Sequence, residues 1–203
     1  NDDLLYPAKV SSVVSRLCEN NNFEEAVSLL TTALEQGVPI AHQVIEYTCS
    51  DVGSSKKGKN PRLAADLYMK ALETLEDAEI KKIKPGSIGF IGKELCTKFE
   101  NDGLKVDLEK AASLYHLALD KGIEMNNESI QYLGSELCDQ VSPEEAARLY
   151  KKALERGVKY IKPGNFKYVF EKLCDKGSKE EARSLYEKTK EKGIRIDSKN
   201  IIL

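Results

Sequence analysis

The sequence contains no tryptophan, two histidines and two methionines among its 203 residues. No apolar stretch approaches the roughly 18 residues of a bilayer-spanning helix, so no membrane span is predicted. Positive charge is not in excess, because 31 Lys and Arg residues stand against 33 Asp and Glu residues. A protein that binds phosphates of nucleic acid usually has a basic balance or a basic stripe, so the overall charge argues mildly against that role.

The sequence also lacks the motifs of common catalytic sites. Gly86, Gly89 and Gly92 recur at three-residue spacing inside a helical pattern and form no G-x-G-x-x-G phosphate loop. No cluster of serine, histidine and acid is indicated, and His116 lies within a pattern typical of a packing helix. Two histidines provide few of the nitrogen ligands that zinc sites commonly use, which argues against a zinc site. The sequence therefore predicts no enzyme activity, no metal and no cofactor.

A motif of alanine, leucine and tyrosine recurs five times. Its clearest copies, AADLYMKAL, AASLYHLAL and AARLYKKAL, begin at Ala64, Ala111 and Ala146, and weaker copies begin at Ala26 and Ala182. The apolar positions of the motif lie on one face of an α-helix. Four copies have a glycine eleven residues after the first alanine, where the left-handed conformation ends a helix. These glycines are Gly37, Gly122, Gly157 and Gly193.

A second amphipathic helix is predicted before each motif. In the first copy, Val10, Val14 and Leu17 follow helical spacing. Two later copies begin with the tetrapeptide IKPG, which contains Pro85 or Pro163. Proline suits the first turn of a helix, because the N–H that it lacks would be unpaired there. Each motif therefore belongs to a helical hairpin.

The spacing of the motifs supports a repeat architecture. The first alanines of the copies are 38, 47, 35 and 36 residues apart, and insertions in two turns explain the long interval. In the second copy Leu75 replaces the glycine, and the polar run after it predicts a longer helix. We predict an all-α fold, in which residues 1–203 form a single α-solenoid domain of about five helix-turn-helix repeats in a right-handed superhelix. The repeats cover approximately residues 8–40, 41–84, 85–125, 126–161 and 162–196, and residues 197–203 cap the last repeat or begin a further helix.

All five cysteines occupy one position of the repeat. Cys18, Cys138 and Cys174 lie 8 residues before the first alanine of the motif, and Cys49 and Cys96 lie 15 before it because of a 7-residue insertion. Equivalent positions on packed helices are on the order of 10 Å apart, whereas a disulfide needs Cα atoms within about 7 Å. We therefore predict unpaired cysteines that pack in the core. Reduced cysteines favour the cytoplasm or another reducing compartment.

Two families share these motifs. The segment LCTKFENDGLKVDLEKAASLYHLALDKG from Leu95 resembles the Sel-one-like branch of the tetratricopeptide-type repeats, and LGSELC from Leu133 is similar to its first-helix signature. The last repeat, KLCDKGSKEEARSLYEKTKEKGIRID from Lys172, resembles a pentatricopeptide repeat. The first resemblance implies an adaptor or scaffold that binds peptides or protein surfaces. The second implies a module that binds single-stranded RNA.

The tetratricopeptide resemblance implies that first-helix side chains line a concave groove. The matching positions are Ser11, Ser15, Glu19, His42, Glu46, Lys93, Gln131, Ser135, Asp139, Lys167, Glu171 and Asp175. Five are acidic and two are lysines, so the groove would repel phosphates and favour a basic or neutral peptide. The alternative is that these are ordinary solvated side chains. We predict a non-catalytic protein–protein interaction scaffold.

An RNA-binding module is the less favoured alternative. The positions that would read bases in a pentatricopeptide repeat match Ser11, His42, Gly89, Gln131 and Lys167, which form no consistent set. A basic cluster of Lys56, Lys57, Lys59 and Arg62 lies in a predicted turn, where charges are usually solvated. Contact of this cluster with nucleic acid or anionic lipid is a further alternative. The sequence leaves the oligomeric state open.

Overall fold

The structure is a computed structural model, which describes residues 6–54, 60–97, 106–158 and 161–195. Within these ranges the chain forms eleven helices and no strand. None of the helices is long and apolar enough to cross a membrane. The helices are α1 (Pro7–Glu19), α2 (Phe23–Glu35), α3 (His42–Gly53), α4 (Pro61–Thr74), α5 (Asp77–Ile80), α6 (Pro85–Cys96), α7 (Leu108–Asp120), α8 (Asn127–Gln140), α9 (Pro143–Glu155), α10 (Pro163–Lys176) and α11 (Lys179–Glu191).

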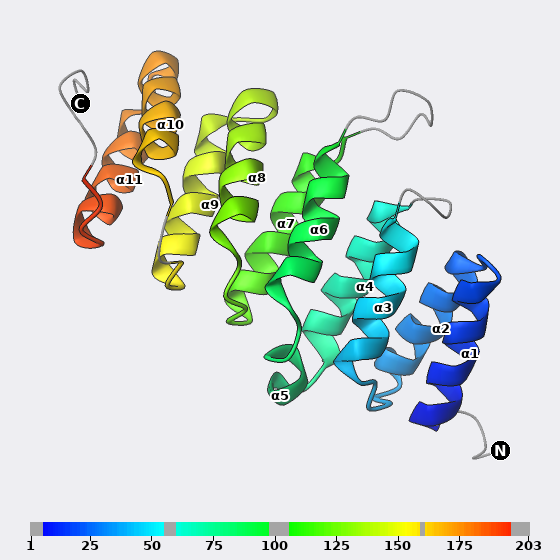
Figure 1. Ribbon diagram of the computed structural model, residues 1–203. Coiled ribbons are helices and arrows are strands. Elements are labelled where there is room, and N and C mark those ends of the chain that lie inside the picture. The colour runs from blue at the N-terminus through cyan, green and yellow to red at the C-terminus, as the bar shows by residue number, and fades with distance from the viewer. Residues whose placement is uncertain (1–5, 55–59, 98–105, 159–160, 196–203) are drawn as a thin grey trace.

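The helices form two layers that run the length of the molecule (Figure 1). The first helices of the hairpins, α1, α3, α6, α8 and α10, form one layer, and the second helices, α2, α4, α7, α9 and α11, form the other. Each first helix packs against its own second helix, and each hairpin packs against the next. This arrangement confirms the predicted α-solenoid over the described residues. The handedness of the superhelix, the single domain and the repeat boundaries stay predictions.

The recurrent motif forms the seam between the layers. Ala64, Leu67 and Tyr68 are completely buried, and the corresponding residues of α7 and α9 are buried as well. Small alanines let the helices approach, while leucine and tyrosine fill the space between hairpins. Tyr115 and Tyr150 pack in the core as Tyr68 does, whereas Tyr186 is partly buried.

The predicted helix boundaries agree with the backbone at both ends. Pro85 and Pro163 are the first residues of α6 and α10. The four predicted terminal glycines have positive φ angles, between 69° for Gly193 and 86° for Gly157. Glycine adopts this conformation without the steric cost that a Cβ atom brings. Proline and glycine therefore mark where these hairpins turn.

The second hairpin ends differently from the sequence prediction. The predicted longer helix is wrong, because α4 ends at Thr74 and Leu75 has an extended backbone, with φ −69° and ψ 151°. The chain then forms the short α5, and Ile80 and Ile83 return to the core with 1% and 3% of their surface exposed. A continued straight helix would carry these two isoleucines away from the core. Burial of apolar side chains thus outweighs the local helical tendency of the polar run.

The cysteines are core residues, as the sequence predicted. Cys18, Cys49, Cys96 and Cys138 are buried, Cys174 is partly buried, and no disulfide joins any two of them. The Cys49 Sγ donates a weak hydrogen bond to the Ala64 carbonyl oxygen at 3.4 Å, within the second hairpin. Burial raises the pKa of Cys96 to about 12 and that of Cys138 to about 11, so these thiols stay protonated at neutral pH. Residues 197–203, which were predicted to cap the last repeat, lie outside the described residues.

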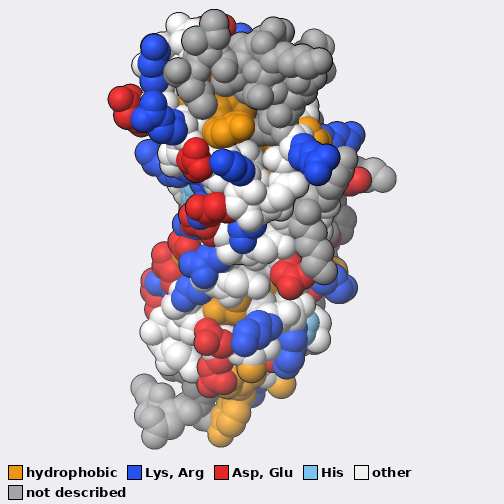
Figure 2. Space-filling view, turned by 90° about the vertical axis from the view of Figure 1, so that its left-hand side faces the viewer, with side chains coloured by type: hydrophobic (Ala, Val, Ile, Leu, Met, Phe, Trp, Pro, Cys, Tyr) orange, Lys and Arg blue, Asp and Glu red, His pale blue; other side chains and the backbone are white. Residues whose placement is uncertain are grey.

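Ion pairs connect successive second helices. Lys70, Lys152 and Lys188 occupy the same motif position, and each pairs with an acid of the preceding hairpin: Lys70 with Glu35 at 2.8 Å, Lys152 with Asp120 at 2.6 Å and Lys188 with Glu155 at 3.5 Å. In the third hairpin Lys110 pairs with Asp66 at 2.6 Å instead. Figure 2 shows acidic and basic side chains interspersed along the stack on the face that it presents. That face therefore offers no extended field of one sign to a charged partner.

Candidate partner-binding face

The first helices present one continuous side of the stack, which we call the first-helix face. It is formed by the outward side chains of α1, α3, α6, α8 and α10. All twelve predicted partner-binding residues lie on these helices. The structure divides them into side chains that join neighbouring hairpins and side chains that are exposed to solvent. Their role in partner binding stays a prediction.

His42 and Glu46 of α3 belong to the first group. Only 8% of His42 and 9% of Glu46 is exposed. Both the His42 main-chain N–H and its Nδ1 lie 3.0 Å from Glu79 Oε2. Hydrogen bonds from Lys82 and His42 lower the pKa of Glu79 to about 2, so this carboxylate is ionised.

Glu46 accepts hydrogen bonds from the start of α6, which is the first helix of the next hairpin. Its Oε1 accepts a hydrogen bond from the Lys84 main-chain N–H at 2.8 Å and one from Ser87 Oγ at 3.0 Å. Lys84 precedes the first residue of α6, where main-chain donors have no partner within the helix. Glu46 therefore holds α6 in place beside α3 rather than standing free in a groove.

Gln131 of α8 repeats this arrangement two hairpins later. Its Oε1 accepts a hydrogen bond from the Lys162 main-chain N–H at 3.3 Å, directly before α10. Ser135 Oγ donates to the Gln131 carbonyl oxygen at 3.0 Å, and Asp139 accepts a hydrogen bond from the Tyr168 hydroxyl. These three predicted residues therefore lie at the junction of α8 and α10.

A hollow of about 460 Å³ opens at the α8–α10 junction. Gln131 and Ser135 line it, so the structure brings two predicted residues together at one concave site. The complete lining is Asn127, Glu128, Gln131, Tyr132, Ser135, Lys162 and Asn165. Amide, hydroxyl, ammonium and carboxylate groups surround one aromatic ring, a composition suited to a polar, extended ligand.

The remaining predicted residues are partly or fully exposed. Ser11 Oγ donates to the Pro7 carbonyl oxygen at 2.8 Å within α1, and Ser15 is partly buried. Lys167 and Glu171 of α10 form an ion pair of 3.8 Å. Glu19 on α1, Lys93 on α6, and Glu171 and Asp175 on α10 are exposed.

Sequence reasoning missed a line of aromatic side chains on this face. Phe90, Tyr132 and Tyr168 lie six residues before the cysteine of the third, fourth and fifth hairpins, and Tyr47 lies one helical turn later in the second. Tyr47, Phe90 and Tyr132 are 45%, 39% and 36% exposed, and Tyr168 is partly buried. We call these four residues the aromatic strip. For Phe90, Tyr132 and Tyr168, the common spacing from the cysteine is the sequence signal that would have revealed them.

Acidic side chains predominate around the aromatic strip in the last three hairpins. The acids on these helices are Glu94, Glu128, Glu136, Asp139, Glu171 and Asp175, and the bases are Lys93, Lys167, Lys172 and Lys176. Lys172 lies over the Tyr168 ring, with its Nζ 5.5 Å from the ring centre. Burial, followed by the charge of Glu136, raises the pKa of Tyr132. Aromatic rings beside carboxylates are suited to apolar and cationic side chains.

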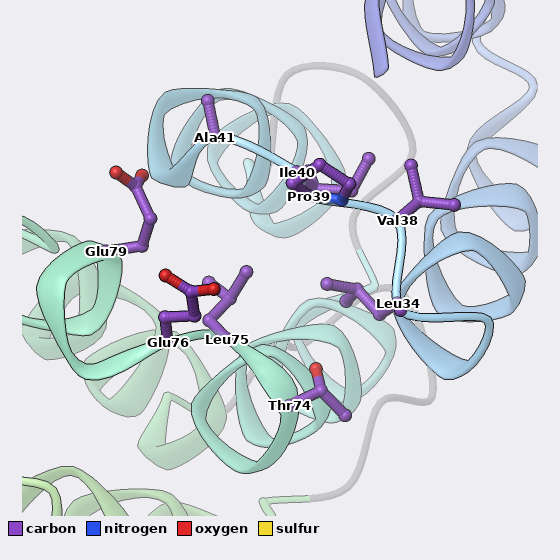
Figure 3. Close-up of a pocket in the computed structure, with 10 residues that line it drawn as sticks. Leu34, Val38, Pro39, Ile40, Ala41, Thr74, Leu75, Glu76 and Glu79 are labelled. Atoms are coloured by element: carbon purple, nitrogen blue, oxygen red, sulfur yellow. The ribbon is translucent and has the colours of Figure 1, made fainter. Parts of the chain in front are cut away.

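Another hollow lies at the turn end of the first two hairpins. It measures about 410 Å³, between the connection before α3 and the connection after α4. Leu34 and Ile40 lie at one side of it and Glu79 at the other, with Leu75 beside Glu76 (Figure 3). Glu79 is already engaged by His42 and Lys82. Within the described residues, no group of three or more His, Cys, Asp or Glu side chains is placed to hold a metal ion.

Comparison with protein-family models identifies a match in the first hairpin. The family model described as PPR repeat matches residues 10–38, which contain most of α1 and all of α2. No curated protein matches the chain. The match lies in the first hairpin, whereas the sequence resemblance to a pentatricopeptide repeat lay in the last. Together with the helical stack, it places the chain among helical repeat proteins.

Proposed function

We propose that this protein is a non-catalytic binding module that holds an extended protein segment across its first-helix face. The observation that carries the proposal is the aromatic strip, which passes through four successive hairpins. Three of its four rings are exposed, and exposed aromatic side chains, whose hydration is unfavourable, are typical of surfaces that bind partners. The rings of the strip would receive apolar side chains of the partner.

The spacing of the hairpins favours an extended partner with a periodic sequence. Packed helices lie about 8–10 Å apart. A polyproline-II segment rises about 3.1 Å per residue, so three residues span roughly the distance between neighbouring first helices. Such a segment would place every third side chain over one ring of the aromatic strip. The residues between would meet the acidic side chains of α6, α8 and α10, which favours lysine or arginine there.

Single-stranded RNA is the second candidate, because PPR repeats commonly bind RNA and a PPR repeat model matches residues 10–38. Aromatic rings also stack on bases. The acids around the strip disfavour phosphate, however. Of the predicted basic cluster, Lys56, Lys57 and Lys59 lie outside the described residues, and Arg62 pairs with Asp107 at 2.8 Å. The charge of the first-helix face therefore favours a protein segment over RNA.

A binding experiment with a designed peptide tests the proposal. The probe is a fluorescent nine-residue peptide with the repeated triplet Leu-Lys-Pro, and fluorescence anisotropy measures its affinity. We expect the combined substitution Phe90→Ser, Tyr132→Ser and Tyr168→Ser to weaken binding at least ten-fold, because the rings that receive leucine are lost. A matched control, Thr32→Ala with Glu73→Ala and Arg148→Ala, changes exposed residues of the second helices and should bind as the unaltered protein does.

Two results would contradict the proposal. One is equal affinity of the aromatic variant and the control variant. The other is preference for RNA: tight binding of a random single-stranded RNA pool that weakens steeply with salt, and that the Leu-Lys-Pro peptide does not displace. A peptide with Leu-Glu-Pro triplets tests the charge argument, since the acids near the strip should weaken its binding.

A further inference from the structure

The junction of α3 and α6 contains a buried hydroxyl group without a hydrogen-bond partner. Tyr68 of α4 has none of its surface exposed, and no described group is placed to pair with its hydroxyl in hydrogen-bonding geometry. This residue lines a hollow of about 230 Å³ together with Ser50, Gly86, Ser87 and Phe90. Ser50 and Gly86 are exposed, so the hollow opens on the first-helix face. A buried, unpaired polar group at such an opening requires an explanation.

The equivalent tyrosines of the next two hairpins are paired. The Tyr115 hydroxyl donates to the Gly89 carbonyl oxygen at 3.2 Å, and the Tyr150 hydroxyl to the Gln131 carbonyl oxygen at 3.4 Å. Each ring lies against a glycine of the first helix, where a Cβ atom would come within 2.2 Å of it. These contacts bring the hydroxyl to the main chain of its own hairpin.

The second hairpin cannot adopt this arrangement. Ile45, which is fully buried, occupies the helix position that Gly92 and Gly134 have in the next two hairpins. Its branched side chain fills the space that the tyrosine ring uses there. Tyr68 lines the α3–α6 hollow instead, and its hydroxyl has no partner in hydrogen-bonding geometry.

The neighbouring polar groups do not accept the Tyr68 proton. Ser87 lies near enough to lower the pKa of Tyr68, but its Oγ donates its own proton to Glu46 Oε1 and is not in hydrogen-bonding geometry with the Tyr68 hydroxyl. Glu46 also accepts the Lys84 main-chain N–H. Burial, then the nearby Cys49 and Glu46, raise the pKa of Tyr68, so its hydroxyl remains a protonated donor.

We propose that the α3–α6 hollow is a subsite for a main-chain carbonyl oxygen of the bound peptide, which accepts the Tyr68 proton. The Phe90 ring, which belongs to the aromatic strip, forms one wall, and Gly86 leaves the mouth of the hollow without a side chain. A neutral acceptor fits better than an anion, because the Glu46 carboxylate lies close by and repels negative charge. The inference deepens the proposed function and rests on it for the identity of the peptide.

Nuclear magnetic resonance of protein labelled at tyrosine ¹³Cζ tests the subsite directly. The probe is N,N-dimethylacetamide, which accepts hydrogen bonds like a peptide carbonyl but donates none. We expect a saturable shift of the Tyr68 resonance, because its hydroxyl gains an acceptor. The Tyr115 resonance should not shift, because its hydroxyl already donates to the Gly89 carbonyl oxygen. Tyr68→Phe and Tyr115→Phe assign the two signals.

The inference is overturned if the Tyr68 resonance does not shift with the probe. It is also overturned if Ser87→Ala moves that resonance without probe as far as the probe moves it, since Ser87 would then be the acceptor. With the Leu-Lys-Pro peptide, Tyr68→Phe should weaken binding several-fold and Tyr115→Phe should not. A probe-induced shift without any peptide binding would refute the proposed function while leaving the subsite in place.

Discussion

Glu144, in the first turn of α9, shows how a single side chain can join two hairpins. It accepts a hydrogen bond from Lys176 Nζ at 2.8 Å and another from Ser178 Oγ. Lys176 ends α10, and Ser178 directly precedes α11. The bonds from Lys176, then Ser178, lower the pKa of Glu144 from 4.5 to about 2. As with His42 and Glu46, a polar residue of one hairpin positions the next.

The depressed pKa of Glu144 predicts a pH dependence of stability. A carboxylate whose pKa is lower in the folded than in the unfolded protein stabilises the fold above the unfolded value of 4.5, and this contribution disappears as the pH falls towards 2. We therefore expect Glu144→Gln to lower the free energy of unfolding at pH 7, with a difference from the unaltered protein that shrinks below pH 4.5. Urea unfolding at several pH values measures it.

An exposed acid provides the control for this pH dependence. Glu180 lies in the first turn of α11 and is exposed. Glu180→Gln should keep nearly the same unfolding free energy as the unaltered protein over the whole pH range. A Glu144→Gln difference that is constant with pH would show that the carboxylate charge is not what stabilises the junction.

At the scale of the helices, close approach depends on glycine inside two helices. A Cβ atom at Gly92 or Gly134 would lie 2.2 Å from the ring of Tyr115 or Tyr150, respectively. Tyr150 also packs edge-on against Phe166 of the next hairpin, with ring centres 5.3 Å apart. Glycine lowers the stability of a helix relative to alanine, but at these two positions it lets each tyrosine fill the seam between hairpins.

Alanine substitutions at two helical glycines distinguish the effect of helix propensity from the effect of packing against the tyrosine ring. We expect Gly134→Ala to destabilise the protein by about 1–3 kcal/mol, because the Tyr150 ring must move within a packed core. Gly164→Ala is the matched control, since a Cβ atom there meets nothing within 4 Å. It should be neutral or stabilising by up to about 1 kcal/mol, as expected for glycine to alanine in a helix. Thermal unfolding measures both, and equal transition temperatures would contradict the packing argument.

At the scale of the whole molecule, the main contacts of each hairpin, over the described residues, are with its neighbours in the stack. The last helix, α11, packs on α10 and on α9. The stability of such a stack is approximately a sum of hairpin contributions and of the interfaces between neighbours. A destabilising substitution in the last hairpin should therefore lower the local stability there and leave the distant hairpins unchanged.

Hydrogen exchange tests this independence. Leu185 of α11 is fully buried, and Leu185→Ala should remove about 2–5 kcal/mol through lost burial and a cavity. We expect faster amide exchange in α10 and α11 and unchanged exchange in α3 and α4, measured by mass spectrometry. Glu187→Ala, an exposed change on the same helix, should leave exchange unaltered. Equally accelerated exchange in α3 would indicate that the stack opens as one unit.

The sequence alone determined the helical repeat, because its signals are local. Alanine, leucine and tyrosine at helical spacing, the prolines that begin α6 and α10, and the glycines that end four hairpins depend on a few neighbouring residues and on backbone sterics. The common position of the five cysteines likewise predicted their burial.

Only the tertiary structure decided which polar side chains face solvent. His42 and Glu46 follow the pattern of a solvated face, yet α5 and the start of α6 cover them. Leu75 turns the chain because Ile80 and Ile83 gain burial in the core. The Tyr68 hydroxyl loses its acceptor because Ile45 replaces a glycine on another helix. Each outcome depends on contacts between residues distant in sequence, which helical periodicity does not encode.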